Sequence, residues 1–188
     1  MTNLNLKKGA SRRSAYDLRK SRPSAAKTHT LSILVDNEAG VLARIVGLFA
    51  GRGFNIESLT VTEIDHTGHL SRITVVSTAN DDIIRQIRAQ LKNVISVHEI
   101  VDLTYDGPSI ERELALHLVD ADDRDRQKIC ALADKFKARL LDTPTGQLVI
   151  EQTGTPHDID RLFDQLREMG LKEVSRTGVV GLQLDDAH

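Results

Sequence analysis

The chain has 188 residues, of which 40% are hydrophobic and 28% are charged, and its net charge is −2. This composition provides enough apolar surface for one or two modest domains, and we expect two. No apolar run approaches the ~18 residues needed to cross a bilayer, and the charged N-terminus precedes no apolar segment, so we expect a cytoplasmic protein. The single cysteine, Cys130, excludes an intrachain disulfide.

Residues 1–28 form a basic, serine-rich segment. They contain eight Lys and Arg residues and one Asp, a net charge of +7, so the rest of the chain carries about −9. The segment lacks apolar periodicity, which predicts a disordered arm. Such an arm fits a solvated extension, docking on an acidic partner, or targeting to nucleic acid or an organelle. We favour the solvated extension and expect neither nucleic acid nor a membrane as a partner.

Residues 29–105 alternate between strand and helix patterns. In chain order these are a strand at 30–35, an amphipathic helix from Val41 to Phe49, strands at 54–64 and 70–77, a helix after Asn80 or Asp81, and a strand at 94–105. Apolar residues recur at spacings of three and four in the helices, and residues 65–69 favour a hairpin turn. The order βαββαβ predicts a four-stranded antiparallel sheet with both helices on one face. The other face then lacks cover, so we expect a dimer.

A turn containing Gly and Pro at 106–109 separates a second unit, residues 109–184. Its predicted elements are a strand with alternating Leu114, Leu116 and Leu118, a helix at 124–137, hairpin strands at 139–142 and 148–152, a helix near Pro156, and a strand at 172–184. The element order repeats that of the first unit, although few residues are identical. The predicted fold class is therefore α+β, with two tandem ferredoxin-like units.

The junction at Asn37–Val41, between the first strand and the first helix, has the character of a receptor for a small carboxylate. Backbone N–H groups at a helix start lack intrahelical acceptors, and the helix dipole favours an anion there. Gly40 has no Cβ and permits close approach, so an amino acid fits such a site. The same residues also fit ordinary roles, with Asn37 as an N-cap, Gly40 as a turn residue and Asn55 as a polar group at a strand entry.

The chain offers little else for chemistry. It has no Gly-rich diphosphate motif, no nucleophile paired with a base and no convincing acid pair, so we expect no catalysis by this chain alone. His66 and His69 lie in a predicted turn without further ligands, and we expect no bound metal. His98 and His117 lie on strands, where burial or an interface is the expected role. Cys130 shares helical spacing with apolar neighbours, which predicts a core side chain.

Several segments carry a resemblance to a known family. Residues 36–42, DNEAGVL, followed by residues 53–61, GFNIESLTV, resemble the first ACT domain of the acetolactate synthase small subunit family. Residues 111–114, EREL, and residues 176–182, RTGVVGL, also resemble that family. The resemblance covers about residues 31–182. The chain departs from the family pattern in two places. Its basic arm is longer, and it lacks the lysine that the family pattern has after the residues equivalent to Thr153 and Gly154.

The resemblance implies a regulatory subunit that binds and activates the large catalytic subunit of acetolactate synthase. That partner is expected to carry thiamine diphosphate, Mg²⁺ and FAD and to condense pyruvate with pyruvate or 2-oxobutyrate, whereas no cofactor is expected on this chain. The resemblance further implies feedback inhibition by branched-chain amino acids, chiefly valine. It assigns effector binding and homodimer formation to an ACT domain at 29–105, followed by a C-terminal domain at 109–184.

The effector-binding candidates are Asn37, Gly40, Val41, Leu42, Asn55 and Ile56. We expect backbone N–H groups at the helix start to bind the ligand carboxylate, and the two Asn side chains to supply amide groups. In related ACT dimers the second Asn comes from the other copy. Arg112, Arg176 and Thr177 are candidates for partner or second-domain contacts because they lie in family-like motifs.

Two other classes of function remain open. One is a stand-alone ACT-type amino-acid sensor that regulates another enzyme or a promoter, and the other is a small enzyme on a ferredoxin-like scaffold, such as an acylphosphatase type. The sensor would use the same pocket, so co-purification with a catalytic subunit distinguishes it from the regulatory subunit. The enzyme would require turnover by this chain alone.

Overall fold

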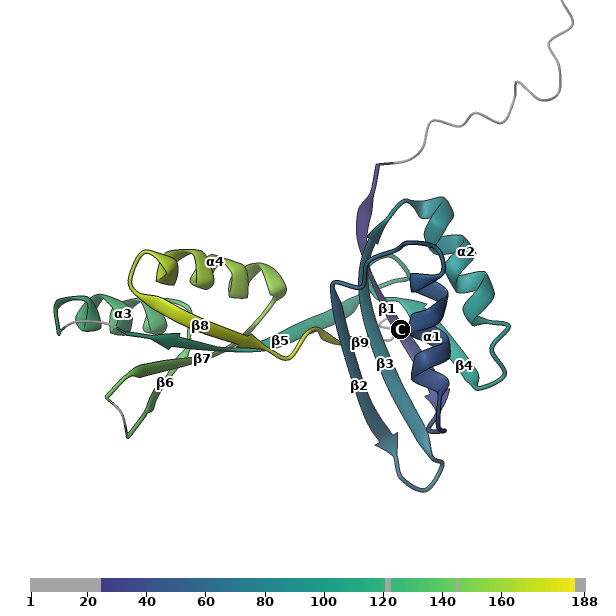
Figure 1. Cartoon of the computed structure of the whole chain (residues 1–188), viewed down its shortest axis with the longest axis horizontal. Helices are drawn as coiled ribbons and strands as arrows, with labels where there is room; N and C mark the ends of the chain where they lie inside the picture. Colours follow the sequence, from purple (N-terminus) through teal and green to yellow (C-terminus); the bar gives the residue numbers. More distant parts are fainter. Residues whose placement is uncertain (1–24, 121–122, 145, 185–188) are drawn as a thin grey trace, which may run out of the picture.

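The computed structural model describes residues 25–120, 123–144 and 146–184. Two units, each a sheet with two helices on one face, lie end to end and meet at a narrow waist (Figure 1). The predicted α+β class and the tandem ferredoxin-like arrangement are confirmed. Most of the arm predicted at residues 1–28 lies outside the described residues. In the described ranges, no helix combines the length and the apolar character needed to span a bilayer.

The N-terminal unit contains β1 (Lys27–Asp36), α1 (Val41–Ala50), β2 (Ser58–Asp65), β3 (Leu70–Ala79), α2 (Asp81–Leu91) and β4 (Val97–Asp102). The strands pair antiparallel in the order β2-β3-β1-β4, so β2 and β4 are the edges. Alternate residues of β1 and β3 point toward the helices, because successive side chains of a strand face opposite sides. The fully buried side chains of this core include Leu31, Ile33, Ile45, Phe49, Ile73, Ile87 and Leu91.

The ends of two strands differ from the prediction. Lys27 and Thr28, which we assigned to the arm, belong to β1, because β3 is long enough to pair with them and the Thr28 and Thr78 hydroxyls lie 2.9 Å apart. β2 begins later than residue 54. Phe54 instead returns to α1, donates its N–H to the Phe49 carbonyl at 3.1 Å and packs on the core.

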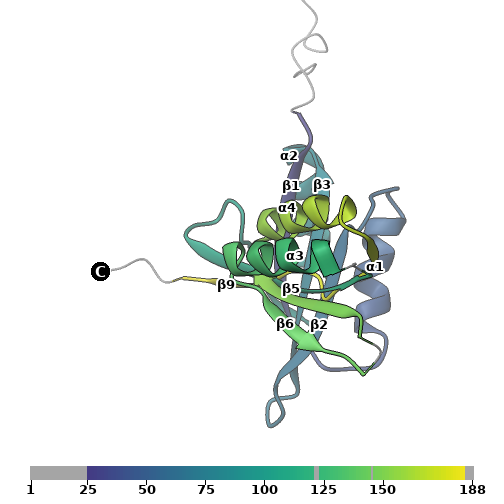
Figure 2. The ribbon, with the colours of Figure 1, turned by 90° about the vertical axis from the view of Figure 1, so that its left-hand side faces the viewer.

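The C-terminal unit contains β5 (Ser109–Val119), α3 (Asp123–Lys135), β6 (Arg139–Asp142), β7 (Leu148–Gly154), α4 (Pro156–Arg167), β8 (Leu171–Arg176) and β9 (Val180–Gln183). Four strands pair antiparallel in the order β6-β7-β5-β8, and α3 and α4 lie side by side on one face of this sheet (Figure 2). The core contains Val119, Ile129, Leu132, Ala133, Leu148, Ile150, Leu162 and Leu166.

The leucines that revealed β5 face away from the helices. Ala115, His117 and Val119 point toward the helices and are completely buried, whereas Leu116 on the other face is 37% exposed. A strict alternation of residues identifies a strand, but it does not say which face the helices cover. His117 is thus a core residue, and Cys130 on α3 is half-buried.

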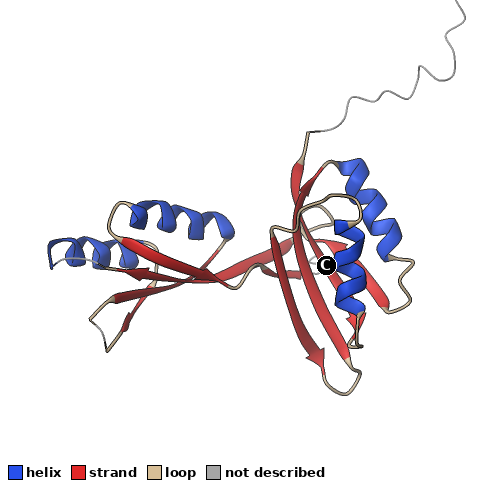
Figure 3. Ribbon diagram, viewed as in Figure 1, coloured by secondary structure: helices blue, strands red, loops and turns tan. Residues whose placement is uncertain are grey.

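The single strand predicted at 172–184 is two strands. β8 ends at Arg176, the chain turns through Gly178 with a φ of +82°, and β9 pairs with the first residues of β5. β5 therefore runs from one unit into the other (Figure 3). The ribbon of β5 and β9 lies over the helix-free face of the N-terminal sheet, where Ser32 and Thr74 are 1% and 4% exposed. The chain itself therefore supplies part of the cover that we expected from a second copy.

Candidate functional site

The start of α1 differs from the starts of α2 and α4. Gly40 precedes α1 with a left-handed φ of 87°, no side chain caps the helix, and its first turn holds no acidic residue. Asn80 caps α2 and Thr155 caps α4. The N–H groups of Leu42 and Ala43 meet no acceptor in the described part of the chain. The start of α1 therefore offers free donors together with the positive end of the helix dipole.

The loop at 36–40 that presents these donors is fixed by its neighbours. Asn37 N–H donates to the His69 carbonyl at 2.6 Å, and Asp36 N–H donates to the Ser96 carbonyl at 2.9 Å. These two bonds tie the loop to the segments that precede β3 and β4. The loop therefore holds these donors in a fixed arrangement, and a fixed arrangement of donors lowers the entropy cost of binding any ligand.

Glu38 is the carboxylate nearest to the helix start in sequence. Its carboxylate accepts hydrogen bonds from the Ser96 hydroxyl and from Arg44 at 2.9 Å. These bonds stabilise the ionised form and lower the pKa of Glu38. Glu38 is thus paired within the chain and does not cap α1.

The six predicted effector residues form two groups at opposite ends of α1. Asn37, Gly40, Val41 and Leu42 lie at its start, and Asn55 and Ile56 lie beyond its end. Asn37 bonds to His69, whereas the Asn55 carbonyl accepts a hydrogen bond from Ser77 at 2.7 Å. His69 and Ser77 are eight positions apart on an extended strand, a separation of roughly 25 Å. One chain therefore does not bring the two groups together.

The exposure of these residues separates packing roles from binding roles. Val41 is 6% exposed and belongs to the core, so only its backbone is available to a ligand. The Asn37 and Asn55 side chains are exposed, and Leu42 is 37% exposed. Ile56 is half-buried and packs on the edge of the core. The available groups are two amides, the backbone donors of α1 and an apolar surface.

An apolar strip runs along the β2 edge of the N-terminal unit. Leu59 and Val61 on β2 are 36% and 45% exposed, although they lie on the helix-covered face of the sheet. On α1, Leu42 and the half-buried Val46 share the flank opposite Arg44, which contacts Ser96 near β4. We call these four apolar residues, Leu42, Val46, Leu59 and Val61, the edge strip. An unpaired edge strand with adjacent apolar side chains is a surface suited to pairing.

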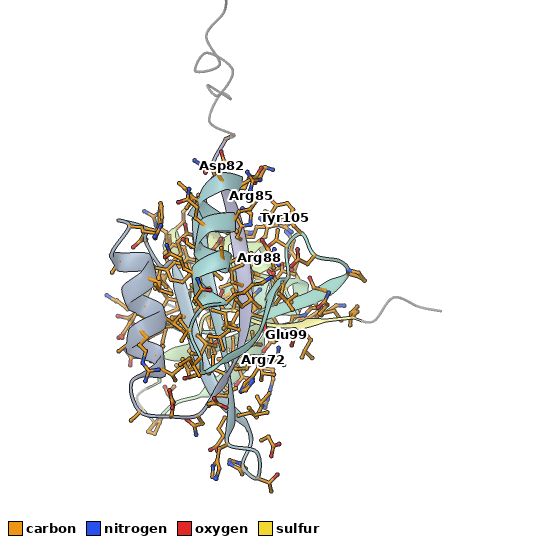
Figure 4. All side chains as sticks on the ribbon, turned by 90° about the vertical axis from the view of Figure 1, so that its right-hand side faces the viewer. Arg72, Asp82, Arg85, Arg88, Glu99 and Tyr105 are labelled. Atoms are coloured by element: carbon orange, nitrogen blue, oxygen red, sulfur yellow. The ribbon has the colours of Figure 1, made fainter. Side chains whose placement is uncertain are left out.

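A polar cluster supports the turn that leads from β4 into the second unit. His29 Nδ1 lies 2.6 Å from Asp102 Oδ2, both residues are buried, and the His29 ring lies 4.8 Å from the Tyr105 ring. Arg88 on α2 donates to both carboxylate oxygens of Asp106 at 3.1 and 2.6 Å. Figure 4 shows Arg88 and Tyr105 on the face of the N-terminal unit that is turned toward the viewer. The cluster fixes the direction in which the chain enters β5.

The three candidates for partner contacts lie in or beside the waist. Arg176 is committed within the chain, because it donates to both carboxylate oxygens of Glu113 at 2.9 and 2.6 Å and to Asp160 at 2.7 Å. These bonds raise the pKa of Arg176. The Thr177 hydroxyl accepts from a backbone N–H of β5. Arg112 is exposed and donates only to its neighbouring carbonyl among the described residues, so it alone of the three is free for a partner.

Sequence reasoning missed three residues at the waist, Ser58, Glu113 and Gly178. Glu113 is 5% exposed and binds Arg176 on the neighbouring strand β8. Val179 N–H donates to the Ser58 hydroxyl at 3.0 Å beside Gly178. The glycine after Arg176 and Thr177 was a signal for a special backbone conformation, but nothing in the sequence identified Ser58 as its neighbour. No group of three or more metal-ligating side chains occurs in the described ranges.

Two family models match this chain. The model described as an AHAS small subunit-like ACT domain covers residues 31–99, and the model of the small subunit of acetolactate synthase covers residues 112–185. The probable acetolactate synthase small subunit of Archaeoglobus fulgidus is 42% identical over 156 residues, which cover 82% of this chain and 95% of the relative. The acetolactate synthase small subunit of Mycolicibacterium smegmatis is 42% identical over 155 residues, with coverages of 82% and 90%.

The similarity also holds in three dimensions. The crystal structure of the acetolactate synthase small subunit from Thermotoga maritima has a TM-score of 0.74 with this chain and is 32% identical, covering 86% of this chain and 99% of that one. Both units are therefore shared with these relatives, whose names designate the small subunit of acetolactate synthase. The chain belongs to the acetolactate synthase small subunit family.

Proposed function

We propose that this chain is a regulatory subunit that binds the large catalytic subunit of acetolactate synthase, raises its activity and makes it sensitive to valine. The observation that carries this proposal is the uncapped start of α1, where free N–H donors meet the positive end of a helix dipole. A free amino acid supplies the carboxylate for these donors. Thiamine diphosphate, Mg²⁺ and FAD belong to the catalytic subunit in this proposal.

The effector site spans two copies of the N-terminal unit. In a two-fold dimer that pairs β2 edges and α1 flanks, the start of α1 in one copy meets the end of α1 in the other. Asn37 and Gly40 then face the partner's Asn55, which removes the separation found within one chain. The edge strip supplies the apolar contact of this interface. Each dimer contains two equivalent sites.

Each part of the ligand has a complement in this site. The carboxylate accepts hydrogen bonds from the N–H groups at the start of α1, beside Gly40. The amide oxygens of Asn37 and of the partner's Asn55 accept from the ammonium group. Leu42 and Ile56 contact the branched side chain. An amino acid with a polar side chain would leave that side chain unpaired against apolar groups, which disfavours it.

Feedback requires that valine bind one arrangement of the complex better than the other, because equal affinity shifts no equilibrium. A site between two sheets meets this requirement, since the ligand contacts both copies and therefore favours one relative position of them. A coupling free energy of about 1–3 kcal/mol is typical of such regulation.

The central experiment is calorimetry of valine binding to the full chain, combined with acetolactate formation by the catalytic subunit. Asn37→Ala should weaken valine binding by about 1–3 kcal/mol, one to two orders of magnitude, and weaken inhibition correspondingly. Stimulation of the catalytic subunit should remain. Wild-type valine binding by Asn37→Ala would contradict the site.

Complementation tests the shared site directly. Asn37→Ala and Asn55→Ala homodimers should each bind valine weakly, because every site lacks one amide. A heterodimer of the two variants, purified through two different tags, contains one intact site and one doubly altered site. It should therefore bind one valine per dimer with wild-type affinity. Absence of this recovery would place both Asn residues in the same chain's site or outside it.

The alternative of a stand-alone sensor has a distinct outcome. A sensor would bind valine in the same calorimetry but would neither co-purify with the catalytic subunit nor change its rate of acetolactate formation. Stimulation without any heat of binding from valine, leucine or isoleucine would instead retain the partner and reject the effector site.

A further inference from the structure

The two units touch through a short segment that sits directly on β2. Val179 N–H donates to the Ser58 hydroxyl at 3.0 Å, and the Thr60 hydroxyl donates to the Thr177 carbonyl at 3.5 Å. Gly178 lies between these bonds. We call Ser58, Thr60 and residues 177–179 the interunit clamp. It joins the chain that leaves β8 to the edge strand of the N-terminal unit.

Position 178 in the clamp requires glycine. Its φ of +82° is left-handed, which favours glycine, and a Cβ at this position would lie 2.5 Å from the Ser58 hydroxyl oxygen and 3.1 Å from that of Thr60. A larger residue must therefore either turn the Ser58 hydroxyl away from its bond with Val179 or push residue 178 away from β2, and both disturb the clamp. The hydrogen bond between Val179 and Ser58 therefore depends on the close approach of residue 178 to β2.

The clamp is anchored firmly on the C-terminal unit. Thr177 N–H donates to the Leu114 carbonyl at 3.0 Å, and Leu114 N–H donates to the Thr177 hydroxyl at 3.2 Å. The adjacent Arg176 holds Glu113 on β5 and Asp160 on α4. If residues 177–179 shift, β5 and α4 therefore shift with them.

On the other side, the clamp adjoins the residues proposed to contact the effector. Asn55 lies three positions before Ser58, and its carbonyl accepts from Ser77 on β3. Glu57 N–H donates to the Val76 carbonyl at 2.8 Å. The stretch at 55–60 is thus held by β3 along one edge and by the clamp on the helix-free face. A ligand that shifts Asn55 also shifts the start of β2.

Beside the clamp, the two units are separated by a cavity of about 660 Å³. It is lined from the N-terminal unit by Thr28 and Glu57, and from the C-terminal unit by Glu111, Glu113 and Asp160, among others. The body of the C-terminal unit does not pack on the N-terminal sheet there, as the waist in Figure 1 illustrates. The clamp and the β5/β9 ribbon therefore set the relative orientation of the units.

We propose that the interunit clamp transmits valine occupancy from the effector site to the C-terminal unit, with Ser58 and Gly178 as positioning residues for feedback. This inference rests on the proposed function and names the regulation of that same site. The two arrangements of the clamp differ in how the start of β2 sits against residues 177–179. Valine at Asn55 favours one of them, and the catalytic subunit senses the resulting orientation of the C-terminal unit.

Gly178→Ala in the full chain, assayed with the catalytic subunit, tests this proposal. The variant should bind valine with a dissociation constant close to wild type, because no effector residue changes. Valine should nevertheless inhibit it far less, so that the roughly 5–150-fold preference of valine for the inhibited arrangement falls toward one. Gly146→Ala is the matched control, since Gly146 also has a positive φ of +77°, but apart from its chain neighbours no described residue has an atom within 4 Å of its Cβ position. It should be inhibited like wild type.

Ser58→Ala is a second variant that adds no atoms and only removes the hydroxyl that binds Val179. It should reduce inhibition in the same direction, and it keeps the test valid if Gly178→Ala does not fold. Thr62→Ala is its control, because within the described residues the Thr62 hydroxyl on the same strand bonds only to the Glu63 carbonyl.

Full valine inhibition of both Gly178→Ala and Ser58→Ala would overturn the clamp while leaving the proposed function intact. Loss of valine binding in both variants would also overturn it, because the clamp would then be part of the effector site itself. A wild-type chain that binds no valine would overturn the proposed function and the clamp together. Wild-type binding with reduced inhibition confined to the clamp variants would support the proposal.

Discussion

The two units share one order of strands and helices but distribute their side chains in opposite ways. In the N-terminal unit, β1 turns Leu31 and Ile33 toward the helices and polar Ser and Thr residues toward the other face. In the C-terminal unit, the equivalent strand β5 turns Glu113 and His117 inward and leaves Leu116 on the helix-free face. A common topology therefore does not imply a common core.

The surfaces left for partners differ accordingly. The helix-free face of the N-terminal sheet is mostly polar and lies under the β5/β9 ribbon, whereas the edge strip of that unit is apolar and partly exposed. The helix-free face of the C-terminal sheet carries leucines, and no described segment lies over it as the ribbon does in the N-terminal unit (Figure 3). The N-terminal unit therefore offers partners an apolar sheet edge, whereas the C-terminal unit offers them an apolar sheet face.

The largest test of this comparison removes a core side chain from one unit only. Phe49→Ala should destabilise the N-terminal unit by about 3–5 kcal/mol, because Phe49 is completely buried among apolar residues. Among the described residues, the side-chain hydrogen bonds that join the two units come from the clamp and the ribbon, so the C-terminal unit should keep its stability. Hydrogen exchange in urea measures both units at once. Amides of β3 should lose protection while amides of β7 retain it.

Leu162→Ala on α4 is the mirror control, since Leu162 is completely buried in the other core. It should remove protection from β7 and leave β3 unchanged. Equal loss of protection in both units with either variant would mean that they unfold as one cooperative body, and the comparison between independent units would fail.

The next test concerns the ion pair between Arg176 and the buried Glu113 in the C-terminal unit. Arg176→Leu leaves the 5% exposed carboxylate of Glu113 without its cation, at a cost of about 2–3 kcal/mol. Arg161→Leu is the matched control, because its ion pair with Asp158 is long, at 3.8 Å, and exposed. It should change stability by less than about 0.5 kcal/mol. Thermal unfolding of the full chain measures both, and equal effects would contradict a structural role for Glu113.

These particulars explain what the sequence predicted well. The spacing of apolar residues in α1, α2 and α4 identified the helices, and the turn residues identified the hairpins, because both signals are local. The βαββαβ order then restricted the topology to one common arrangement. The motif around Gly40 predicted the start of α1 for the same reason, since a left-handed residue before a helix is visible as glycine. Binding of an amino acid at this junction stays a prediction.

Features that depend on contacts between distant residues were not predictable. Nothing in the sequence places Gly178 against Ser58, 120 positions earlier in the chain. The predicted burial of His117 is confirmed, but its place under the helices was not predictable, because Leu114, Leu116 and Leu118 made the opposite face of β5 the more apolar one. The division of the last strand into β8 and β9 depends on a return to the other unit, which no local pattern records.

A pH titration sharpens the comparison through His117. Neither of its ring nitrogens has a hydrogen-bond partner among the described residues. Burial lowers the pKa of His117, and the charge of Arg176 acts in the same direction. The unfolded chain binds the proton near pH 6.5, so stability is fully present above that pH and falls as the pH drops below it. The loss for one proton is at most about 1.4 kcal/mol per pH unit.

His117→Leu should remove this pH dependence from the C-terminal unit, as followed by hydrogen exchange at pH 5–7. His98 is the control, because it is exposed and lies 2.7 Å from Asp36 at the surface of the N-terminal unit. His98→Asn should leave the stability of the C-terminal unit and its pH dependence unchanged. A C-terminal unit whose stability is flat between pH 5 and 7 would show that His117 is not buried as a neutral side chain.

The smallest expected effect separates a cap from a binding group. Asn80→Ala removes the bond that the Asn80 side chain accepts from Ile83 N–H at 3.0 Å, and it should cost about 1 kcal/mol in thermal unfolding. Asn37→Ala should cost less than about 0.5 kcal/mol without ligand, because no side chain caps α1. With saturating valine the difference in stability between Asn37→Ala and the wild type should grow, since only the wild type gains stability from a tightly bound ligand. If Asn37→Ala costs as much as Asn80→Ala in the absence of ligand, Asn37 serves the helix itself, and the donors of α1 are not reserved for an amino acid.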